Sequence, residues 1–87
     1  MTMWMVEREL PGIDQAGLAA AQAAAISEAE AMRGRGVEVR YLKSIWAPER
    51  ERCMCLFEAG SVDDVKALND AAGLPYAGVT AAAELAP

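Results

Sequence analysis

Charged side chains within otherwise apolar stretches are the residues best placed to do chemistry. Glu7 and Arg8 follow a mostly apolar stretch, Lys43 interrupts a second, and Glu58 ends a third. In a pocket, Glu7 or Glu58 would move a proton, and Lys43 would hold an anion or stabilise developing negative charge. The alternatives are ion pairs at strand ends for the carboxylates and an ammonium group that reaches solvent for Lys43. The catalytic candidates are therefore Glu7, Lys43 and Glu58.

A second set of residues could bind a ligand rather than transform it. Trp4, Tyr41 and Trp46 are aromatic residues on predicted strands, where they could form the walls of a small-molecule pocket. Ser44 and Cys55 would add polar atoms to the same strands. Packing at a contact between two copies of the chain would explain the aromatic residues equally well.

Cys53 and Cys55 lie two residues apart on one predicted strand, so their side chains point the same way. A disulfide between them would require backbone distortion. A soft metal would need two further ligands, and the chain contains no His. We therefore expect buried, unreactive thiols, no metal and no cofactor, and we find no glycine-rich phosphate loop or nucleophile elbow.

Composition limits the class of protein. The 87 residues are expected to form one domain, residues 1–87, with a net charge of −5 that disfavours nucleic acid as a partner. No apolar run approaches the roughly 20 residues of a membrane span, and the first residues lack the features of a signal peptide. We therefore expect a cytoplasmic protein. The hydrophobic fraction of 54% is high for so small a core, and it favours a homodimer.

Six elements must position these residues. Turn and capping signals separate them, and the predicted order is a strand from Met3 to Glu9, a helix from the N-cap Asp14 to about Met32, strands Val37 to Ala47 and Arg52 to Gly60, a helix from Ser61 to Gly73, and a strand from Tyr76 to Leu85. The fold class is α+β: a ferredoxin-like βαββαβ chain, with a four-stranded antiparallel sheet that carries two helices on one face. Two such sheets stacked face to face would form a dimeric α/β barrel.

Two strands carry further expectations. The five apolar residues from Cys53 to Phe57 predict a central strand that is covered on both faces. In the strand Val37 to Ala47 neither side is cleanly apolar. Simple alternation places Val37, Val39, Tyr41 and Ile45 on one side, and Glu38, Arg40, Leu42, Ser44 and Trp46 on the other.

Several segments together resemble a known family. In chain order they are Met5-Val6-Glu7-Arg8-Glu9-Leu10-Pro11-Gly12, Leu42-Lys43-Ser44 with Trp46, Arg52 to Ala59 with Cys55 and Glu58, and Ala72-Gly73-Leu74-Pro75. The similarity runs along nearly the whole chain, and it is to the small bacterial ferredoxin-like proteins that include the actinobacterial nickel-responsive, nickel-binding protein. This resemblance implies a dimeric ferredoxin-like barrel, in agreement with the order of elements.

The resemblance also identifies a departure from the family pattern. Relatives often carry His just before the Ser of the second strand and another His in the second helix. Lys43 and Leu68 occupy these places here. Nickel favours imidazole ligands, and a lysine cation repels a metal ion. This departure from the family pattern therefore favours a pocket without metal, lined by the same strands.

Three classes of function remain open. The leading hypothesis is a small-molecule binding protein whose pocket is lined by Trp4, Tyr41 and Trp46 and takes an apolar or anionic compound, oriented by Lys43 and Glu7. The alternatives are a cofactor-free isomerase or cyclase of a biosynthetic pathway, and a protein that binds nickel or another metal.

Overall fold

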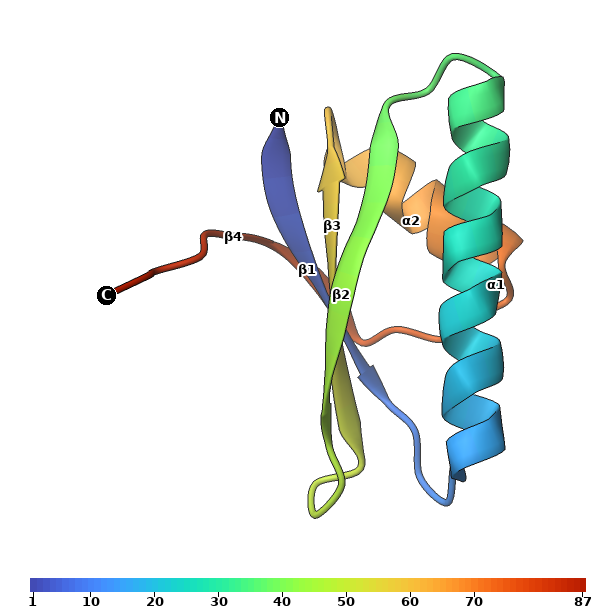
Figure 1. The fold of residues 1–87 in the computed structure, drawn as a ribbon, viewed down its shortest axis with the longest axis vertical. Coiled ribbons are helices and arrows are strands. Elements are labelled where there is room, and N and C mark those ends of the chain that lie inside the picture. Colours follow the sequence, from blue (N-terminus) through green and yellow to red (C-terminus); the bar gives the residue numbers. More distant parts are fainter.

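The computed structural model describes all residues, 1–87, and contains four strands and two helices. In chain order they are β1 (Thr2–Glu9), α1 (Gln15–Gly34), β2 (Val39–Ala47), β3 (Arg52–Ala59), α2 (Val62–Ala71) and β4 (Gly78–Ala82). This is the βαββαβ order that the sequence predicts (Figure 1).

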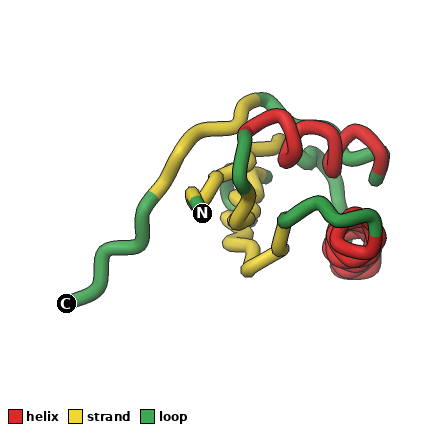
Figure 2. The backbone as a smooth tube through the Cα atoms, turned by 90° about the horizontal axis from the view of Figure 1, so that it is seen from above, coloured by secondary structure: helices red, strands yellow, loops and turns green.

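The strands form one antiparallel sheet in the order β2-β3-β1-β4. Both helices lie on the same face of this sheet, and the other face carries no helix (Figures 1 and 2). Together with the order of elements, this arrangement is the ferredoxin-like fold. The predicted central position of β3 is confirmed, since it lies between β2 and β1.

The long helix α1 is held by caps at both ends. The Asp14 carboxylate accepts a hydrogen bond from the Gly17 N–H at 2.7 Å, as expected of an N-cap. At the other end, Gly36 has a φ of 86° and the Val37 N–H donates to the Met32 carbonyl at 3.0 Å. This Schellman motif turns the chain from α1 back towards β2.

Helix α2 is bounded by the signals that the sequence contains. The Ser61 hydroxyl accepts from the Asp64 N–H at 3.3 Å, and Gly73 adopts a φ of 70° just past the last turn. The Leu74 N–H then donates to the Asn69 carbonyl at 3.0 Å, which completes a second Schellman motif. These contacts fix the direction in which the chain leaves α2 for β4.

Strand β2 contains a β-bulge, and the bulge corrects one prediction. Tyr41 pairs with Phe57 of β3, but Lys43 pairs with the next residue along β3, Leu56, so that Leu42 has no partner of its own. One extra residue in a strand reverses the alternation of every side chain that follows it.

The predicted sides of β2 are therefore wrong beyond Leu42. Ser44 and Trp46 pair with Cys55 and Cys53, whose side chains are buried beneath the helices, so both share the helix-covered face with Tyr41. Ile45 lies on the open face instead, where it is 53% exposed. The bulge thus gathers Tyr41, Ser44 and Trp46 on one side of the sheet.

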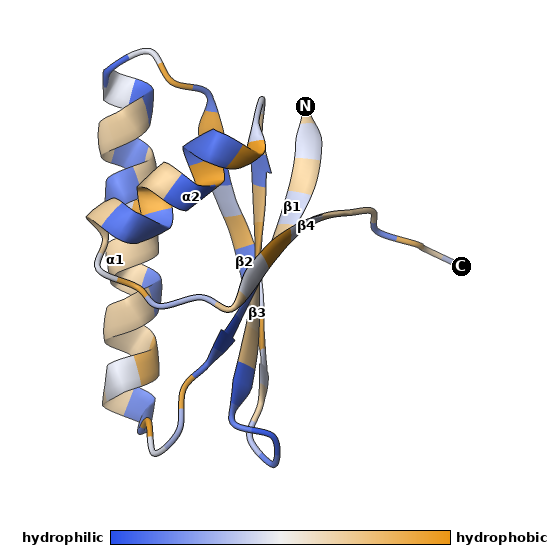
Figure 3. Ribbon diagram, turned by 180° about the vertical axis from the view of Figure 1, so that it is seen from behind, coloured by the Kyte–Doolittle hydropathy of each residue, from blue (hydrophilic) through white to orange (hydrophobic).

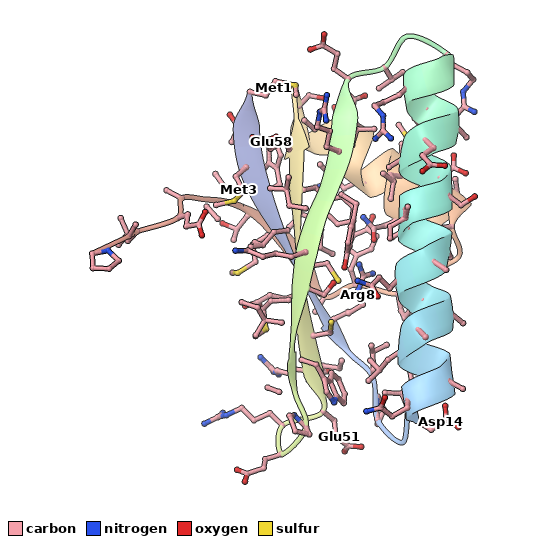
Figure 4. All side chains as sticks on the ribbon, viewed as in Figure 1. Met1, Met3, Arg8, Asp14, Glu51 and Glu58 are labelled. Carbon is pink, nitrogen blue, oxygen red and sulfur yellow. The ribbon has the colours of Figure 1, made fainter.

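The open face of the sheet carries a group of apolar side chains together with charged ones. Its central side chains come from three strands and are Met3, Met5, Ile45, Met54 and Leu56. Figure 4 shows Met3 pointing away from the helices. In this single chain β3 is therefore buried on one face only and half-buried on the other, which differs from the prediction of a strand covered on both faces. Residues 83–87 extend away from the body on this side (Figures 1 and 3).

No helix of the chain combines the length and the apolar character that crossing a membrane requires.

Candidate functional site

A cavity of about 280 Å³ lies between α1 and the helix-covered face of the sheet. Most of its fourteen lining residues are hydrophobic. Helix α1 and the loop that leads into it contribute Leu10, Gln15, Leu18, Ala19, Ala21, Gln22 and Ala25. The sheet and the loop after α2 contribute Arg8, Tyr41, Ser44, Trp46, Cys53, Cys55 and Leu74. Figure 4 shows the Arg8 side chain in the space between the sheet and the helices.

Small side chains on both walls create this space. Leu18, Ala21, Gln22 and Ala25 recur at three- and four-residue steps, so they lie on one face of α1. Most of α1 is coloured light orange in Figure 3, which reflects its many alanines. Across from it, the centre of the sheet carries cysteine rather than a larger residue, so helix and sheet do not fill the volume between them.

Arg8 is the charged residue of the cavity wall, and only 2% of its surface is exposed to solvent. Its guanidinium donates from Nη2 to the Asn69 Oδ1 at 2.8 Å and from Nη1 to the Pro75 carbonyl at 3.1 Å. The Asn69 Nδ2 in turn donates to the Val65 carbonyl at 2.8 Å, which fixes the orientation of the amide. No carboxylate oxygen lies within 4.0 Å of the Arg8 guanidinium, since the ion pairs of the chain all involve other residues.

The hydroxyl and thiol groups of the pocket form a connected chain of hydrogen bonds. Gln22 Nε2 donates to the Tyr41 hydroxyl at 3.1 Å, and that hydroxyl lies 2.6 Å from Ser44 Oγ. Ser44 Oγ donates to Cys55 Sγ at 3.0 Å. Because Ser44 enters this face only through the β-bulge, the chain of hydrogen bonds depends on the bulge.

The two thiols of the pocket are free and adjacent. The Sγ atoms of Cys53 and Cys55 lie 3.7 Å apart, and both side chains are buried. Burial raises the pKa of Cys53 from 9.0 to about 11, the neighbouring Cys55 adds to the rise, and the charge of Arg8 opposes it only in part. Cys53 is therefore a neutral thiol at neutral pH, as expected of a buried and unreactive cysteine.

Four of the five predicted ligand-binding residues line this one cavity. They are Tyr41, Ser44, Trp46 and Cys55. The fifth, Trp4, lies on the same face of the sheet but outside the cavity wall, and its indole Nε1 donates to the Ala59 carbonyl at 3.3 Å. Tyr41 also packs edge-on against Phe57, with ring centroids 5.5 Å apart.

The three predicted catalytic residues lie on the opposite face of the sheet. Glu7, Lys43 and Glu58 pair with Met54, Leu56 and Met3 respectively, all of which face away from the helices. The Lys43 ammonium binds the Glu84 carboxylate at 3.2 Å, and its side chain is largely exposed. The predicted pairing of a Lys and a Glu within the pocket is thus replaced by the single cation Arg8.

Arg8 was noted beside Glu7 in the sequence but not selected as a site residue, although a signal for its burial existed. Val6 and Arg8 are two residues apart on β1, so a buried Val6 implies a buried Arg8. Alternation places Glu7 on the other face by the same reasoning. A charge at the end of a strand is usually solvated, and this expectation concealed the signal.

Comparisons with known proteins identify the family. A family model described as "Nickel responsive protein SCO4226-like" matches residues 4–81. A comparison with curated proteins finds no match. The crystal structure of SCO4226 from Streptomyces coelicolor A3(2) superposes with a TM-score of 0.79 at 20% sequence identity, over 97% of this chain and 99% of that one. At this identity the likeness shows the fold.

The donor atoms of this chain do not suit nickel. It contains no cluster of three or more His, Cys, Asp or Glu side chains that could hold a metal ion. The two positions at which the resemblance implies His are on different sides of the sheet, since Lys43 is on the open face and Leu68 is a fully buried residue of α2. A ligating Cys53 would have to lose its proton, and its raised pKa opposes this.

Proposed function

The chain belongs to the SCO4226-like family of nickel responsive proteins, and we propose that in this member the cavity between α1 and the sheet binds a small, mostly apolar molecule. The observation that carries the proposal is a cavity of about 280 Å³ with mainly hydrophobic walls and a few convergent polar groups. Ligand sites commonly have this composition, because apolar walls provide affinity and the polar groups fix orientation.

The walls suit a flat or compact ligand. Pockets for drug-sized molecules measure roughly 300–1,000 Å³, so this cavity would take a smaller compound, such as one with a single ring. Trp46 and Leu18 offer large apolar surfaces from opposite walls, and Tyr41 and Ser44 offer hydroxyl groups. The residues that a cofactor-free isomerase would have used, Glu7, Lys43 and Glu58, are on the other face, so binding is the better supported function.

The same proposal includes a second copy of the chain as a partner. The open face of the sheet presents Met3, Met5, Ile45, Met54 and Leu56, and such an apolar face on a small domain is stabilised when another protein surface covers it. Arg40 and Glu58 pair across this face, so it also carries both signs of charge. A two-fold symmetric homodimer joined through this face would form the predicted α/β barrel.

Indole, a neutral and compact aromatic compound of two fused rings, tests the pocket by isothermal titration calorimetry. We expect the wild-type protein to bind indole and the Ala21→Leu variant to lose most of that affinity, because Ala21 lines the cavity and a larger side chain fills it. Ala23→Leu is the matched control, since Ala23 is exposed on the same helix and outside the cavity wall. Equal binding by both variants, or none by the wild type, would contradict the proposal.

A further inference from the structure

The buried guanidinium of Arg8 lacks a counter-charge within the protein. A guanidinium carries five N–H donors, and the structure uses those that reach Asn69 and Pro75, both of which are neutral acceptors. Burying a cation without a paired anion is strongly unfavourable. Most buried arginines are therefore paired with a carboxylate, and Arg8 is not.

Nearby acidic groups do not fill this role. Cys53 pairs with Arg8 across β1 and β3, but burial keeps its thiol protonated, with a pKa of about 11. Glu7 and Glu9 flank Arg8 in the chain, yet both point to the open face, and Glu9 binds Arg52 instead. The cavity wall contains no Asp or Glu at all.

The register of the sheet places a gap beside this cation. Arg8, Cys53 and Trp46 form one row across β1, β3 and β2, and Cys53 is the smallest of the three. The next row contains Cys55 and Ser44, which are also small. A ligand seated over the two cysteines would have the guanidinium on one side and the Trp46 indole on the other.

We propose that the cavity binds a small organic monocarboxylate, with its carboxylate on Arg8 and its apolar body against Trp46 and Leu18. This inference rests on the proposed binding function and adds the chemical class of the ligand. Planar guanidinium and carboxylate groups form paired hydrogen bonds, and these are strong in a site that excludes water.

A monoanion suits the site better than a phosphate. Arg8 is the one cation among the lining residues, so a carboxylate brings the net charge of the buried pair to zero. A phosphate monoester carries close to two negative charges at neutral pH and would leave one of them buried without a partner.

Three ligands of nearly equal shape test the proposal on the wild-type protein: phenylacetate, its neutral amide phenylacetamide, and phenyl phosphate. We expect phenylacetate to bind at least about tenfold more tightly than the amide, the ratio given by one charged hydrogen-bonded pair. Phenyl phosphate should bind more weakly than phenylacetate. Isothermal titration calorimetry at neutral pH measures the affinity of all three. Indole, which has no carboxylate, serves as the reference for binding to the apolar walls alone.

Two variants assign the preference to Arg8. Arg8→Met should bind phenylacetate no more tightly than phenylacetamide and should still bind indole, whereas Arg8→Lys should retain part of the preference for the carboxylate. If Arg8→Met does not fold, the ratios on the wild-type protein decide alone. Binding of indole without a preference for phenylacetate would overturn this inference and leave the proposed function intact. Tighter binding of phenyl phosphate would also overturn it, and failure of every ligand to bind would overturn both.

Discussion

Arg8 shows how a single residue determines the character of the site. It is held by Asn69 and by the carbonyl of Pro75, which belong to α2 and to the loop after it, so the guanidinium joins the sheet to the second helix. Without these two acceptors the side chain would be free to turn towards solvent. The residues around Arg8 therefore keep it in the pocket whether or not a ligand is bound.

The Cys53 thiol gives a prediction about stability at high pH. Its pKa in the folded protein, about 11, exceeds the value of 9.0 expected when it is unfolded. Below pH 9 both states hold the proton, and the burial of the neutral thiol contributes its full stability. As the pH rises through this window the unfolded state loses the proton first, so the free energy of unfolding falls between pH 9 and about 11.

Urea denaturation at several pH values measures this effect. We expect the wild-type protein to lose more stability between pH 9 and 11 than the Cys53→Ala variant does, since that variant has no thiol to titrate at this position. The comparison subtracts the other groups that titrate at high pH, because they are common to both proteins. Parallel profiles for the two proteins would show that the buried thiol is not responsible.

At the scale of elements, β2 is the strand whose side chains could not be assigned to the correct face of the sheet from the sequence alone. The existence, order and type of all six elements could be predicted, because caps, glycines and prolines mark their ends locally. A β-bulge leaves no such local mark, since it depends on how β2 and β3 pair. Lys43 therefore seemed to interrupt an apolar side, and Ser44 and Trp46 were assigned to the face opposite Tyr41.

For the candidate site, individual wall residues could be predicted from the sequence, but the cavity could not. Aromatic type alone indicated Tyr41 and Trp46 as wall residues, and the structure places both in the cavity wall. The cavity itself could not be foreseen, because it results from small residues on α1 lying opposite small residues on β3. That arrangement is a property of packing between two elements and has no counterpart in either segment alone.

Two glycines test the account of helix ends. Gly73 has a φ of 70° with no atom close to where a Cβ would stand, so Gly73→Ala should destabilise the protein by about 1–2 kcal/mol through backbone strain alone. Gly34 is the last residue of α1, its φ is not positive, and no atom lies close to where its Cβ would stand, so Gly34→Ala should stabilise the protein by a few tenths to about 1 kcal/mol.

Thermal or urea unfolding of the two variants provides the measurement. A lower free energy of unfolding for Gly73→Ala and a higher one for Gly34→Ala would support the left-handed C-terminal cap at Gly73. A Gly73→Ala variant as stable as the wild type would contradict the Schellman motif described for α2.

At the scale of the whole molecule, the two faces of the sheet differ in kind. One face is covered by helices and contains the cavity. The other carries methionines, aliphatic residues and charged side chains, and no helix covers it (Figures 1 and 4). Residues 83–87 leave the body on the open side, and Glu84 reaches across it to Lys43. A second copy seated on this face would bury the apolar side chains that the single chain leaves partly exposed.

Sedimentation experiments test the proposed homodimer. We expect the wild-type protein to sediment as a dimer and Leu56→Lys to sediment as a monomer, because Leu56 lies near the centre of the open face and a charge there would be buried in the interface. Ala67→Lys introduces the same charge on the exposed side of α2 and should remain a dimer. A monomeric wild-type protein, or a dimeric Leu56→Lys, would rule out this interface.

The central claim is that a small molecule occupies the space between α1 and the sheet. Intermolecular nuclear Overhauser effects between bound phenylacetate and the protein measure its position directly. The account predicts contacts from the ring to the Ala21 and Ala25 methyl groups and to the Trp46 indole, with the carboxylate end nearest Arg8. Contacts confined to Met3, Met5 or Leu56 on the open face would contradict it.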